Sequence, residues 1–465
     1  MKINQEKLFQ VEEIPGTWER RKLGEICFTT SGGTPSRKVK SYYDGTIPWV
    51  KSGELEKGTI TQTEEYISQE GLQSSSAKIF PKGTLLIALY GATIGKLGFL
   101  GVDAATNQAI CGIFHNPFID LKFLKHFLFS NRRKLVGQSA GGAQPNISQT
   151  ILKDLHVVIP PLAEQQRIVA RIEELFSSLD AGVESLKKAQ AQLKTYRQAV
   201  LKWAFEGRLT NPDVKDGELP AGWKLIKIGD CATVGTGATP LKSTKEYYEN
   251  GNIPWVTSGA LNDEHVKEAT DFVTEKAVRE TNLTLYSKQT LLLAMYGEGK
   301  TRGKCSELMI EACTNQAIAA ICFEKHDVRI KSYLKYFLLF NYNNVRNLAA
   351  GGVQPNLNLG IVRKTLFPLP PTLAQQQQVV AEIETRLSVC DKLEESIAQS
   401  LKQAEALRQS ILKKAFEGKL VPQDPKDEPA SVLLERICVE REKAGSTVAK
   451  IPTPARRKKK PCPKQ

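Results

Sequence analysis

The most regular pattern of apolar and polar positions along this chain follows the proline pair Pro160 and Pro161. Apolar positions recur there at alternating spacings of four and three residues, the pattern of a helix that buries a seam against a partner helix. The seam positions are Ile168, Ile172, Leu175, Leu179, Gly182, Leu186, Ala189, Leu193, Tyr196, Val200 and Trp203. Because no further proline interrupts the segment before Gly207, the pattern predicts one long helix that ends at that glycine.

The same seam returns 211 residues later, after Pro370 and Pro371, and Gly418 ends it. Its positions are Val379, Ile383, Arg386, Cys390, Leu393, Ile397, Ser400, Ala404, Leu407, Ile411 and Lys414. Two helices of about 45 residues, each roughly 65 Å long, predict an antiparallel coiled coil within the chain. Two unrelated core helices are the alternative, which is disfavoured because core helices average about 11 or 12 residues. We interpret Trp203 as core and expect a close helix contact or a bend at Gly182.

The repeat extends beyond the helices, because six sets of residues recur in the same order at offsets of 205 to 211. The recurring sets are Trp18 and Gly24 as Trp223 and Gly229; Thr34, Pro35, Tyr42 and Tyr43 as Thr239, Pro240, Tyr247 and Tyr248; IPWV at 47–50 and 253–256; TNQAI at 106–110 and 314–318; GG with QPN at 141–146 and 351–356; and LKWAFEGRL at 201–209 as LKKAFEGKL at 412–420. The sequence therefore consists of two copies of one repeat.

Each copy begins with about 150 residues in which short β-prone runs, such as 85–89 and 289–294, alternate with Gly, Pro and Asn turns. One basic, helical stretch stands out in each copy, at 121–136 and 330–348. We therefore predict an α+β protein with two repeated mixed α/β domains joined by two long helices. The predicted parts are a first domain at 1–160, a central helix at 161–208, a second domain with a short leading linker at 209–370, a distal helix at 371–419, and a short helix with a basic tail at 420–465.

The net charge of the chain indicates which class of partner it binds. Lys and Arg number 64 against 50 acidic residues, giving a net charge of +14, and six of the basic residues lie in the last ten positions. Such an excess is typical of proteins that bind phosphates, with a neutral alkaline surface as the alternative. No apolar run approaches the roughly 20 residues that a membrane span needs, and no signal peptide is seen, so we expect a cytoplasmic protein.

Residues that carry catalysis or bind metal show no recognisable pattern. None of the nine cysteines is spaced from another like a pair of zinc ligands, and the five histidines form neither an HExxH motif nor a triad spacing. The scattered cysteines are typical of reduced thiols. We expect neither a metal site nor a nucleophilic active site.

Five motifs make the chain resemble, over essentially its whole length, the specificity subunit of type I restriction-modification enzymes. They are GGTPS at 32–36, IPWVKSG at 47–53, IPPLAEQQRI at 159–168, LPPTLAQQQQV at 369–379 and DEPASVLLERI at 427–437. The resemblance implies two target recognition domains that each read one half of a bipartite double-stranded DNA site, and helices that act as a spacer. One departure is Gln375 where the first copy has Glu164, which leaves the role of that position open.

The same resemblance implies the partners and places catalysis outside this chain. Two methyltransferase (M) subunits would bind along the helices and restriction (R) subunits would complete an ATP-driven nuclease. Those partners would use S-adenosylmethionine, ATP and Mg²⁺, whereas this chain would bind no cofactor. The sequence also has neither DPPY nor NPPF, the tetrapeptides of the adenine pocket in N6-adenine methyltransferases.

Two readings from other classes compete with this interpretation. AMYGEGKT at 294–301 fits a relaxed phosphate-loop pattern and would make the chain an ATPase that uses Lys300 and Thr301, although the following residues are a poor helix start. A helical scaffold without sequence-specific DNA contact is the other alternative.

Residues shared by both copies cannot distinguish two different half-sites, so we interpret the TP…YY, IPWV and TNQAI motifs as scaffold. Specificity must come from the segments that diverge, 37–41 against 241–246, 54–82 against 260–288 and 92–105 against 298–313. Basic side chains, the usual readers of guanine and phosphate, give as candidates Arg37, Lys38, Lys40, Lys51, Lys96, Lys242, Lys245, Lys300, Arg302 and Lys304. Further candidates for hydrogen bonds to adenine are Gln144, Asn146, Gln354 and Asn356, for which a structural turn is the favoured alternative.

Overall fold

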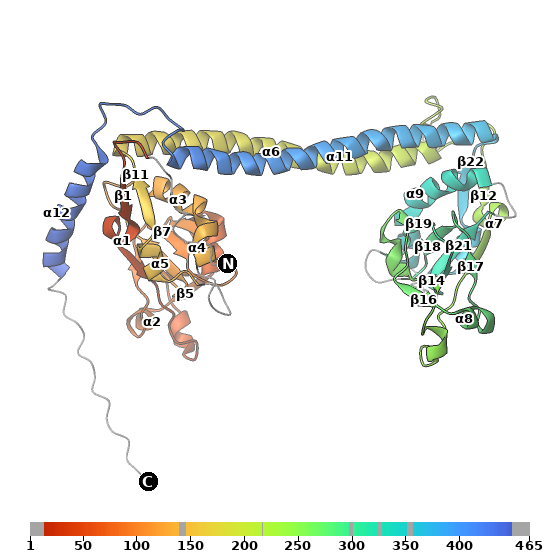
Figure 1. Ribbon diagram of the computed structural model, residues 1–465, viewed down its shortest axis with the longest axis horizontal. Coiled ribbons are helices and arrows are strands. Elements are labelled where there is room, and N and C mark those ends of the chain that lie inside the picture. The colour runs from red at the N-terminus through yellow and green to blue at the C-terminus, as the bar shows by residue number, and fades with distance from the viewer. Residues whose placement is uncertain are drawn as a thin grey trace, which may run out of the picture. The chain divides into compact units, whose positions relative to one another are not determined.

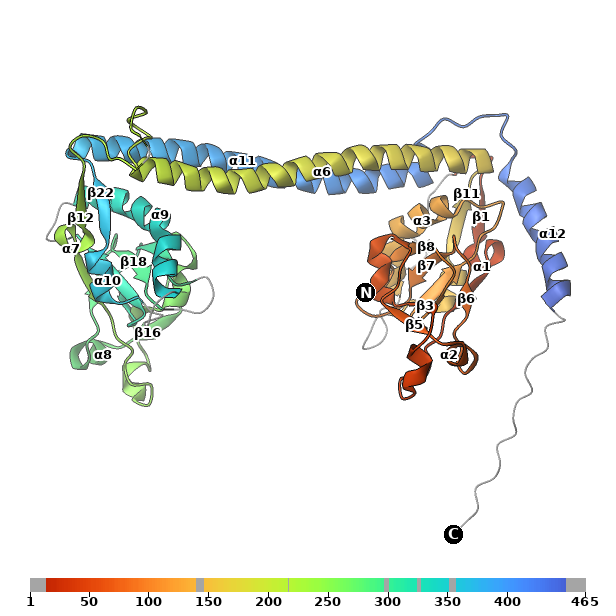
Figure 2. The same cartoon turned by 180° about the vertical axis from the view of Figure 1, so that it is seen from behind.

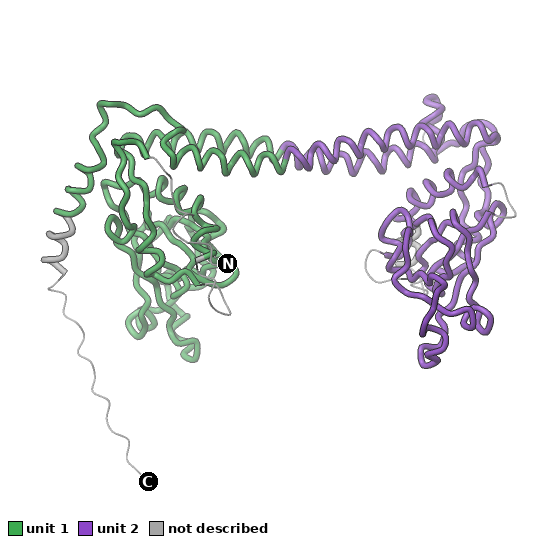
Figure 3. The backbone as a smooth tube through the Cα atoms, in the orientation of Figure 1, with its two compact units in different colours: residues 1–184, 401–465 green, residues 185–400 purple. Residues whose placement is uncertain are grey.

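The structure is a computed structural model that describes residues 14–138, 146–215, 217–296, 301–323, 328–350 and 357–448. It divides into two compact units (Figure 3). Unit 1 is built within residues 1–184 and 401–465, and unit 2 is built within residues 185–400. Each unit holds one copy of the repeat together with parts of both long helices.

The two predicted long helices are α6 (Leu162–Phe205) and α11 (Leu373–Phe416). Within unit 1 the beginning of α6 lies beside the end of α11, and within unit 2 the end of α6 lies beside the beginning of α11 (Figures 1 and 2). Arg408 pairs with Asp180 in unit 1, and Arg197 pairs with Glu394 at 2.9 Å in unit 2. The predicted antiparallel pairing is therefore confirmed.

The heptad seam is buried in part of its length only. Fully or almost fully buried seam residues are Ile168, Ile172, Val200, Val379, Ile383, Cys390, Ile397 and Ile411. The structure contradicts the expectation for Trp203 and one of the two alternatives for Gly182. Trp203 is 37% exposed rather than part of the core, and a Cβ at Gly182 would meet nothing within 4 Å, so a close helix contact does not explain that glycine.

Both long helices end at the predicted glycines. Gly207 and Gly418 have φ values of 76° and 71°, a left-handed conformation that favours glycine and stops the helix. Each glycine also lies against a proline ring, Gly207 against Pro220 and Gly418 against Pro15, where a Cβ would come within 2.4 Å of the ring. The same turn thus follows both helices.

Unit 1 contains a five-stranded sheet in the order β2-β10-β7-β8-β4, a four-stranded sheet in the order β5-β3-β9-β6, and the ribbon β1-β11. Pairing is antiparallel except for β3 with β9 and β4 with β8. The strands are β1 (Glu19–Lys22), β2 (Thr29–Ser31), β3 (Ile47–Val50), β4 (Thr59–Ile60), β5 (Glu65–Ile67), β6 (Ile79–Phe80), β7 (Leu85–Ala88), β8 (Leu97–Leu100), β9 (Ala104–Thr106), β10 (Ile110–Ile113) and β11 (His156–Ile159).

Unit 2 repeats this topology strand for strand, as β13-β21-β18-β19-β15, β16-β14-β20-β17 and β12-β22. Its parallel pairs, β14 with β20 and β15 with β19, are the counterparts of those in unit 1. The strands are β12 (Lys224–Lys227), β13 (Thr233–Thr236), β14 (Ile253–Val256), β15 (His265–Val266), β16 (Asp271–Val273), β17 (Leu285–Tyr286), β18 (Leu291–Ala294), β19 (Cys305–Leu308), β20 (Ala312–Thr314), β21 (Ile318–Cys322) and β22 (Leu366–Leu369).

Apart from α12, the shorter helices also correspond between the units, with α9 in the place of α3 and α4 together. They are α1 (Leu23–Ile26), α2 (Gln69–Gln73), α3 (Leu121–Ser130), α4 (Arg132–Gln138) and α5 (Gln149–Lys153) in unit 1, α7 (Ile228–Cys231), α8 (Glu275–Glu280), α9 (Lys331–Ala350) and α10 (Leu359–Lys364) in unit 2, and the C-terminal α12 (Ala430–Val448). Short 3₁₀ segments are η2 (Lys40–Tyr43), η3 (Ser52–Lys57), η4 (Lys245–Tyr247), η5 (Ser258–Asn262) and η6 (Val328–Ile330). None of the described helices is long and apolar enough to cross a membrane.

Two sequence-derived element bounds need correction. The helix predicted at 121–136 is interrupted at Asn131, whose backbone N–H and side-chain amide both donate to the carbonyl of Phe127 and cap α3. The strand predicted to start at Gln289 begins at Leu291, because Gln289 has a left-handed φ of 71° and its N–H donates to the carbonyl of Leu308 outside the strand ladder. The helix predicted at 330–348 is α9.

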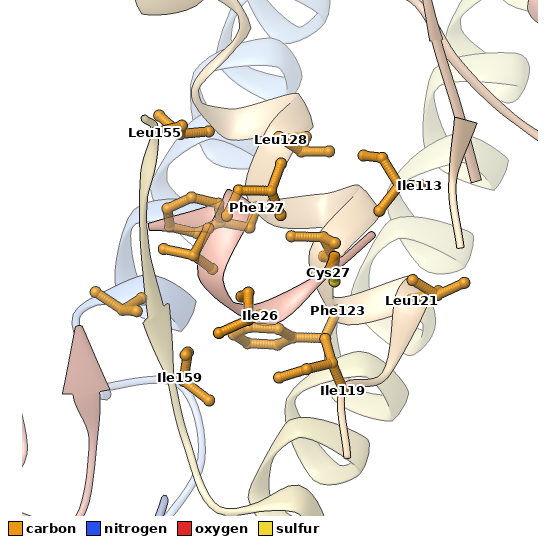
Figure 4. Close-up of a cluster of buried hydrophobic side chains, with 14 of the residues drawn as sticks. Ile26, Cys27, Ile113, Ile119, Leu121, Phe123, Phe127, Leu128, Leu155 and Ile159 are labelled. Carbon is orange, nitrogen blue, oxygen red and sulfur yellow. The ribbon is translucent and has the colours of Figure 1, made fainter. Parts of the chain in front are cut away.

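The two large sheets of unit 1 pack face to face, with α3 on the outer face of the five-stranded sheet. Val50, Phe80 and Ala104 of the smaller sheet meet Leu86, Ala88 and Ile110 of the larger sheet in one buried cluster. The opposite face of the larger sheet packs against α1 and α3, where Ile26, Phe123 and Phe127 are buried (Figure 4). Apolar side chains on both faces explain why the central strand β7 reads as an uninterrupted apolar run.

The C-terminal segment closes over the start of α6 in unit 1. Asp427 accepts two hydrogen bonds from Arg167, at 3.3 and 2.6 Å, and Leu434 and Ile437 of α12 join the buried core. Beneath it Glu164 is buried and accepts a hydrogen bond from Trp18 Nε1 at 2.9 Å. Burial raises the pKa of Glu164. The corresponding Gln375 in unit 2 is exposed and bonds to Thr372, so this departure between the copies reflects different cover over the two helix starts.

Candidate nucleic-acid interface

The motifs that both copies share hold one another in place. In unit 1 the indole N–H of Trp49 donates to the carbonyl of Gly33 at 3.0 Å, and the hydroxyl of Tyr43 donates to the carbonyl of Pro35 at 2.7 Å. The same bonds recur in unit 2, from Trp255 to Ala238 at 3.1 Å and from Tyr248 to Pro240 at 2.6 Å. Recurrent internal bonds support the scaffold interpretation of these residues.

The TP and TNQA motifs are joined to each other in both units. Thr34 donates to the side-chain carbonyl of Gln108, and Thr239 donates to that of Gln316 at 2.6 Å. Gly32, two residues before Thr34, lies against the end of the strand that contains Thr106, since a Cβ at Gly32 would lie 2.1 Å from Thr106 Oγ1. Only glycine therefore fits this approach of two backbones.

Two of the candidate DNA contacts in unit 1, Arg37 and Lys51, are joined by one carboxylate. Glu65 pairs with Arg37 at 2.7 Å and with Lys51 at 3.1 Å, while the guanidinium of Arg37 lies over the ring of Tyr43 at 4.2 Å. The hydrogen bond from Arg37 holds the pKa of Glu65 below its ordinary value despite partial burial. Lys51 also pairs with Glu64 at 2.9 Å, so two carboxylates balance the two cations and hold them beside the four-stranded sheet.

The remaining candidates near this point are exposed. Lys38 and Lys40 lie at the start of η2, and Lys242 and Lys245 lie at the equivalent place in unit 2, where Lys245 is within 3.9 Å of Glu249. Exposed lysines on a loop that diverges between the copies are suited to phosphate contacts. Their role in DNA binding remains a prediction.

A second group of candidates lies on a loop that leaves the central strand of each large sheet. The loop returns at Lys96 in unit 1 and at Lys304 in unit 2, where the carbonyl of the lysine accepts a hydrogen bond from Ala88 or Ala294 at 2.9 Å. Six residues, 89–94, form the loop in unit 1, and eight residues, 295–302, form it in unit 2. The base of the loop, which we call the stem and which Ala88 and Lys96 or Ala294 and Lys304 form, is therefore the same in both units. The loop that the stem carries differs in length and sequence.

Asn146 lies next to this loop, because it forms a bridge with Tyr90 directly after β7. The structure thus brings Asn146 to the same end of the large sheet as Lys96. Arg302 in unit 2 is half-buried on the loop itself. The other four candidates of this group, which are Gln144, Lys300, Gln354 and Asn356, lie outside the described residues.

The phosphate-loop reading is contradicted by the element that follows it. A phosphate loop leads into a helix whose N-terminal N–H groups bind the phosphate. Here Thr301 leads through a turn at Gly303, with φ of 83°, into strand β19. The described part of this segment therefore lacks the helix that a nucleotide site of this type needs.

Sequence reasoning missed the acceptors that hold the candidate lysines. Lys96 forms an ion pair with Glu56 of η3, and Lys304 donates to Asn262 of η5 at 2.7 Å. The internal repeat contains a signal for this pairing, because the offset of 206 that relates Trp49 to Trp255 also relates Glu56 to Asn262. Their contact with the lysines depends on the parallel pairing of distant strands.

No metal centre emerges from the side chains that the structure describes. Among them, no group of three or more His, Cys, Asp or Glu residues is arranged to hold an ion. The thiols of Cys111 and Cys305 are buried, and burial raises the pKa of each to about 12. At neutral pH these two cysteines are therefore protonated core residues.

Comparison with known proteins assigns the duplicated scaffold to a family. The model of the Type I restriction modification DNA specificity domain matches residues 15–194 and again residues 220–403. The chain belongs to this family. The resemblance seen in the motifs is thereby confirmed, and the two family matches coincide with the two internal copies.

One relative of the same family matches along nearly its whole length. The type I restriction enzyme MjaIX specificity subunit of Methanocaldococcus jannaschii is 26% identical over 427 residues, which cover 88% of this chain and 95% of that protein. A chain in a structure concerning complex assembly and conformational transition of the type I R-M system aligns with a TM-score of 0.70 and 21% identity, over 88% of this chain and 100% of that chain.

The HsdS subunit from Thermoanaerobacter tengcongensis aligns with a TM-score of 0.60 and 20% identity, over 88% of this chain and 99% of that chain. These structural likenesses establish the fold of the family. The predicted α+β architecture, with two repeated domains and two long paired helices, is confirmed.

Proposed function

We propose that this chain is the specificity subunit of a type I restriction-modification complex, in which each unit reads one half of a bipartite double-stranded DNA site. The observation that carries the proposal is one scaffold present twice with different loops on the same stem. A constant stem fixes where the reading side chains lie, and a variable loop decides which bases they meet. The net charge of +14 supports a nucleic acid as the ligand.

The helices α6 and α11 would space the half-sites and receive two methyltransferase (M) subunits. Their apolar side chains are not all used within the chain, because Tyr196, Val389 and Leu393 in unit 2 and Leu407 in unit 1 are 38–53% exposed. Exposed apolar side chains on an otherwise polar helix pair are suited to contact with partner helices. Trp203, which is also exposed, adds a further apolar side chain for such contacts.

Catalysis in this proposal belongs to the partners. The methyltransferase and restriction (R) subunits would bring S-adenosylmethionine, ATP and Mg²⁺, and this chain would bind none of them. Its own task is to fix the two recognition units on the DNA and to present the helices for assembly. DNA as the ligand fits the cytoplasmic location predicted from the sequence.

A map of methylated adenines tests the proposal. Cells that express this chain with its partner methyltransferase are expected to methylate one split motif, and cells that lack only this chain are expected to lose that motif. Exchange of residues 92–105 for 298–313 is expected to change one half of the motif and preserve the other. Identical maps with and without the chain, in cells where the methyltransferase is active, would instead favour the helical scaffold.

The spacer role predicts a change in geometry without a change in reading. Insertion of seven residues into α6 at Asp180 and seven into α11 at Arg408, which face each other, adds about 10 Å while keeping the heptad register. The unspecified spacer of the motif is expected to grow by roughly 3 base pairs, at 3.4 Å each, with both halves unchanged. Methylation mapping measures both. An altered half-site with an unaltered spacer contradicts the spacer role.

A further inference from the structure

Lys96 and Lys304 are equivalent positions with equally fixed backbones. Gly95 N–H donates to the carbonyl of Ala88 at 2.8 Å, and Gly303 N–H donates to that of Ala294 at the same distance. Both glycines have left-handed φ values, 72° and 83°, which turn the chain back toward the sheet. The two lysines therefore leave the loop stem in the same way, immediately after its divergent residues.

The side chains of the two lysines are held by one structural position that differs chemically. Residue 56 of η3 is glutamate and forms an ion pair with Lys96, whereas its counterpart at 262 in η5 is asparagine, whose side-chain carbonyl accepts from Lys304 at 2.7 Å. Glu56 and Asn262 are both exposed, so DNA in contact with the loop could meet either pair.

The chemical difference changes the charge that DNA meets. A carboxylate cancels the ammonium charge of Lys96 and itself repels phosphate, so DNA must first displace it. An amide orients the ammonium of Lys304 and leaves its full positive charge available. An ion pair between exposed groups is weak, so the carboxylate attenuates the contact rather than abolishing it.

We propose that Lys96 and Lys304 contact the DNA phosphate backbone at equivalent points of the two half-sites and that residue 56 or 262 sets the strength of that contact. The second unit, with asparagine, then holds its half-site more tightly than the first. Glu56 and Asn262 act as positioning residues through the lysines. This inference rests on the proposed function and adds the source of an affinity difference between the units.

Reciprocal exchange at this position tests the inference. The full chain, assembled with its methyltransferase subunits, is titrated with a duplex that carries the mapped motif at several KCl concentrations. Glu56→Asn is expected to tighten binding about five- to tenfold at 0.15 M salt and to steepen the salt dependence of log K by up to about 0.9, the value of one complete phosphate contact. Asn262→Glu is expected to weaken binding and flatten the dependence by the same amounts.

Controls separate a local effect from a change in total charge. Glu435→Asn removes one negative charge from an exposed position on helix α12, outside the segments that diverge between the copies, and is expected to leave the salt dependence unchanged. In a Lys304→Ala background, Asn262→Glu is expected to lose most of its effect, because the residue acts through the lysine. Melting curves check that each variant is folded.

The methylated motif distinguishes failure of this inference from failure of the proposed function. With the phosphate role, both exchanges keep the motif and change only affinity and salt dependence. An unchanged salt dependence alongside an intact motif overturns this inference and leaves the proposed function standing. A changed base in the motif overturns the phosphate assignment, since the lysine would then read a base edge. Loss of sequence-specific methylation in the unaltered complex contradicts the proposed function itself.

Discussion

Replacing Phe205 by alanine is expected to destabilise unit 2 by about 3–5 kcal/mol and to leave unit 1 unchanged. Phe205 is the last residue of α6, and its ring lies 5.3 Å from Tyr333, 5.4 Å from Phe337 and 5.4 Å from Phe340, measured between ring centroids. The ring thereby anchors the long helix to α9 over the large sheet. Alanine leaves a cavity that these aromatic neighbours cannot fill.

The internal repeat supplies the matching experiment in unit 1. Phe416 ends α11 and packs edge-on against Phe123 at 5.5 Å and Phe127 at 5.2 Å. Phe416→Ala is therefore expected to destabilise unit 1 by a similar amount and to spare unit 2.

Hydrogen exchange measured by mass spectrometry resolves the two units in one chain. Each substitution is expected to raise exchange in the sheets of its own unit, and urea unfolding gives the free energy. Lys202→Ala is the control, because its side chain is 59% exposed on the same helix and should cost less than about 1 kcal/mol. Equal effects of the two phenylalanine substitutions on both units would contradict separate anchors.

The second large effect is expected at an ionic cluster of unit 2 that has no counterpart among the described residues of unit 1. Glu307 on β19 lies 2.7 Å from Lys331 and 3.4 Å from Lys335, and these three side chains are 13–14% exposed. His265 on the neighbouring strand lies 3.8 Å from the same carboxylate. Glu307→Gln leaves two poorly solvated ammonium groups without their counter-charge and is expected to destabilise unit 2 by about 3 kcal/mol in urea unfolding at pH 7.

Unit 1 shows how the same site is built without the carboxylate. Strand register places Phe99 opposite Leu85 as Glu307 lies opposite Leu291, and Lys125 of α3 lies over the Phe99 ring at 5.5 Å. The double change Glu307→Phe with Lys331→Leu imports this apolar arrangement and is expected to recover most of the lost stability. Failure of the double variant to exceed Glu307→Gln would show that the cluster is not replaceable by packing.

The pH dependence of this cluster has a definite sign. Burial alone would raise the pKa of Glu307, but the hydrogen bond and charges of Lys331 and Lys335 hold it below the ordinary value of 4.5. A lowered carboxylate pKa stabilises the fold above the unfolded-state value, and that contribution is lost as the pH falls through the folded-state value. The stability difference between the unaltered chain and Glu307→Gln is therefore expected to shrink below about pH 4.5.

Much of the architecture is determined by local sequence. The heptad seams, the proline pairs before them and Gly207 and Gly418 after them locate both long helices to within a few residues, because proline and glycine restrict the backbone wherever they stand. The sequence repeat is sufficient to identify the residues of the scaffold that both units share. The local pattern did not predict the interruption at Asn131, because the apolar positions keep a helical spacing past this residue. The hydrogen bond from the Asn131 side chain to the carbonyl of Phe127 nevertheless ends α3 there.

The environment of the charged side chains was decided by the tertiary structure alone. The sequence nominated Arg37, Lys51 and Lys96 as charged contacts, yet each meets a glutamate that folding brings to it, through strand pairing or through the packing of a 3₁₀ turn against a loop. The exposure of Trp203 and the burial of Glu164 against Trp18 have the same origin. Period and backbone restriction act within a few residues, whereas ion pairing and burial depend on which distant segments the fold brings together.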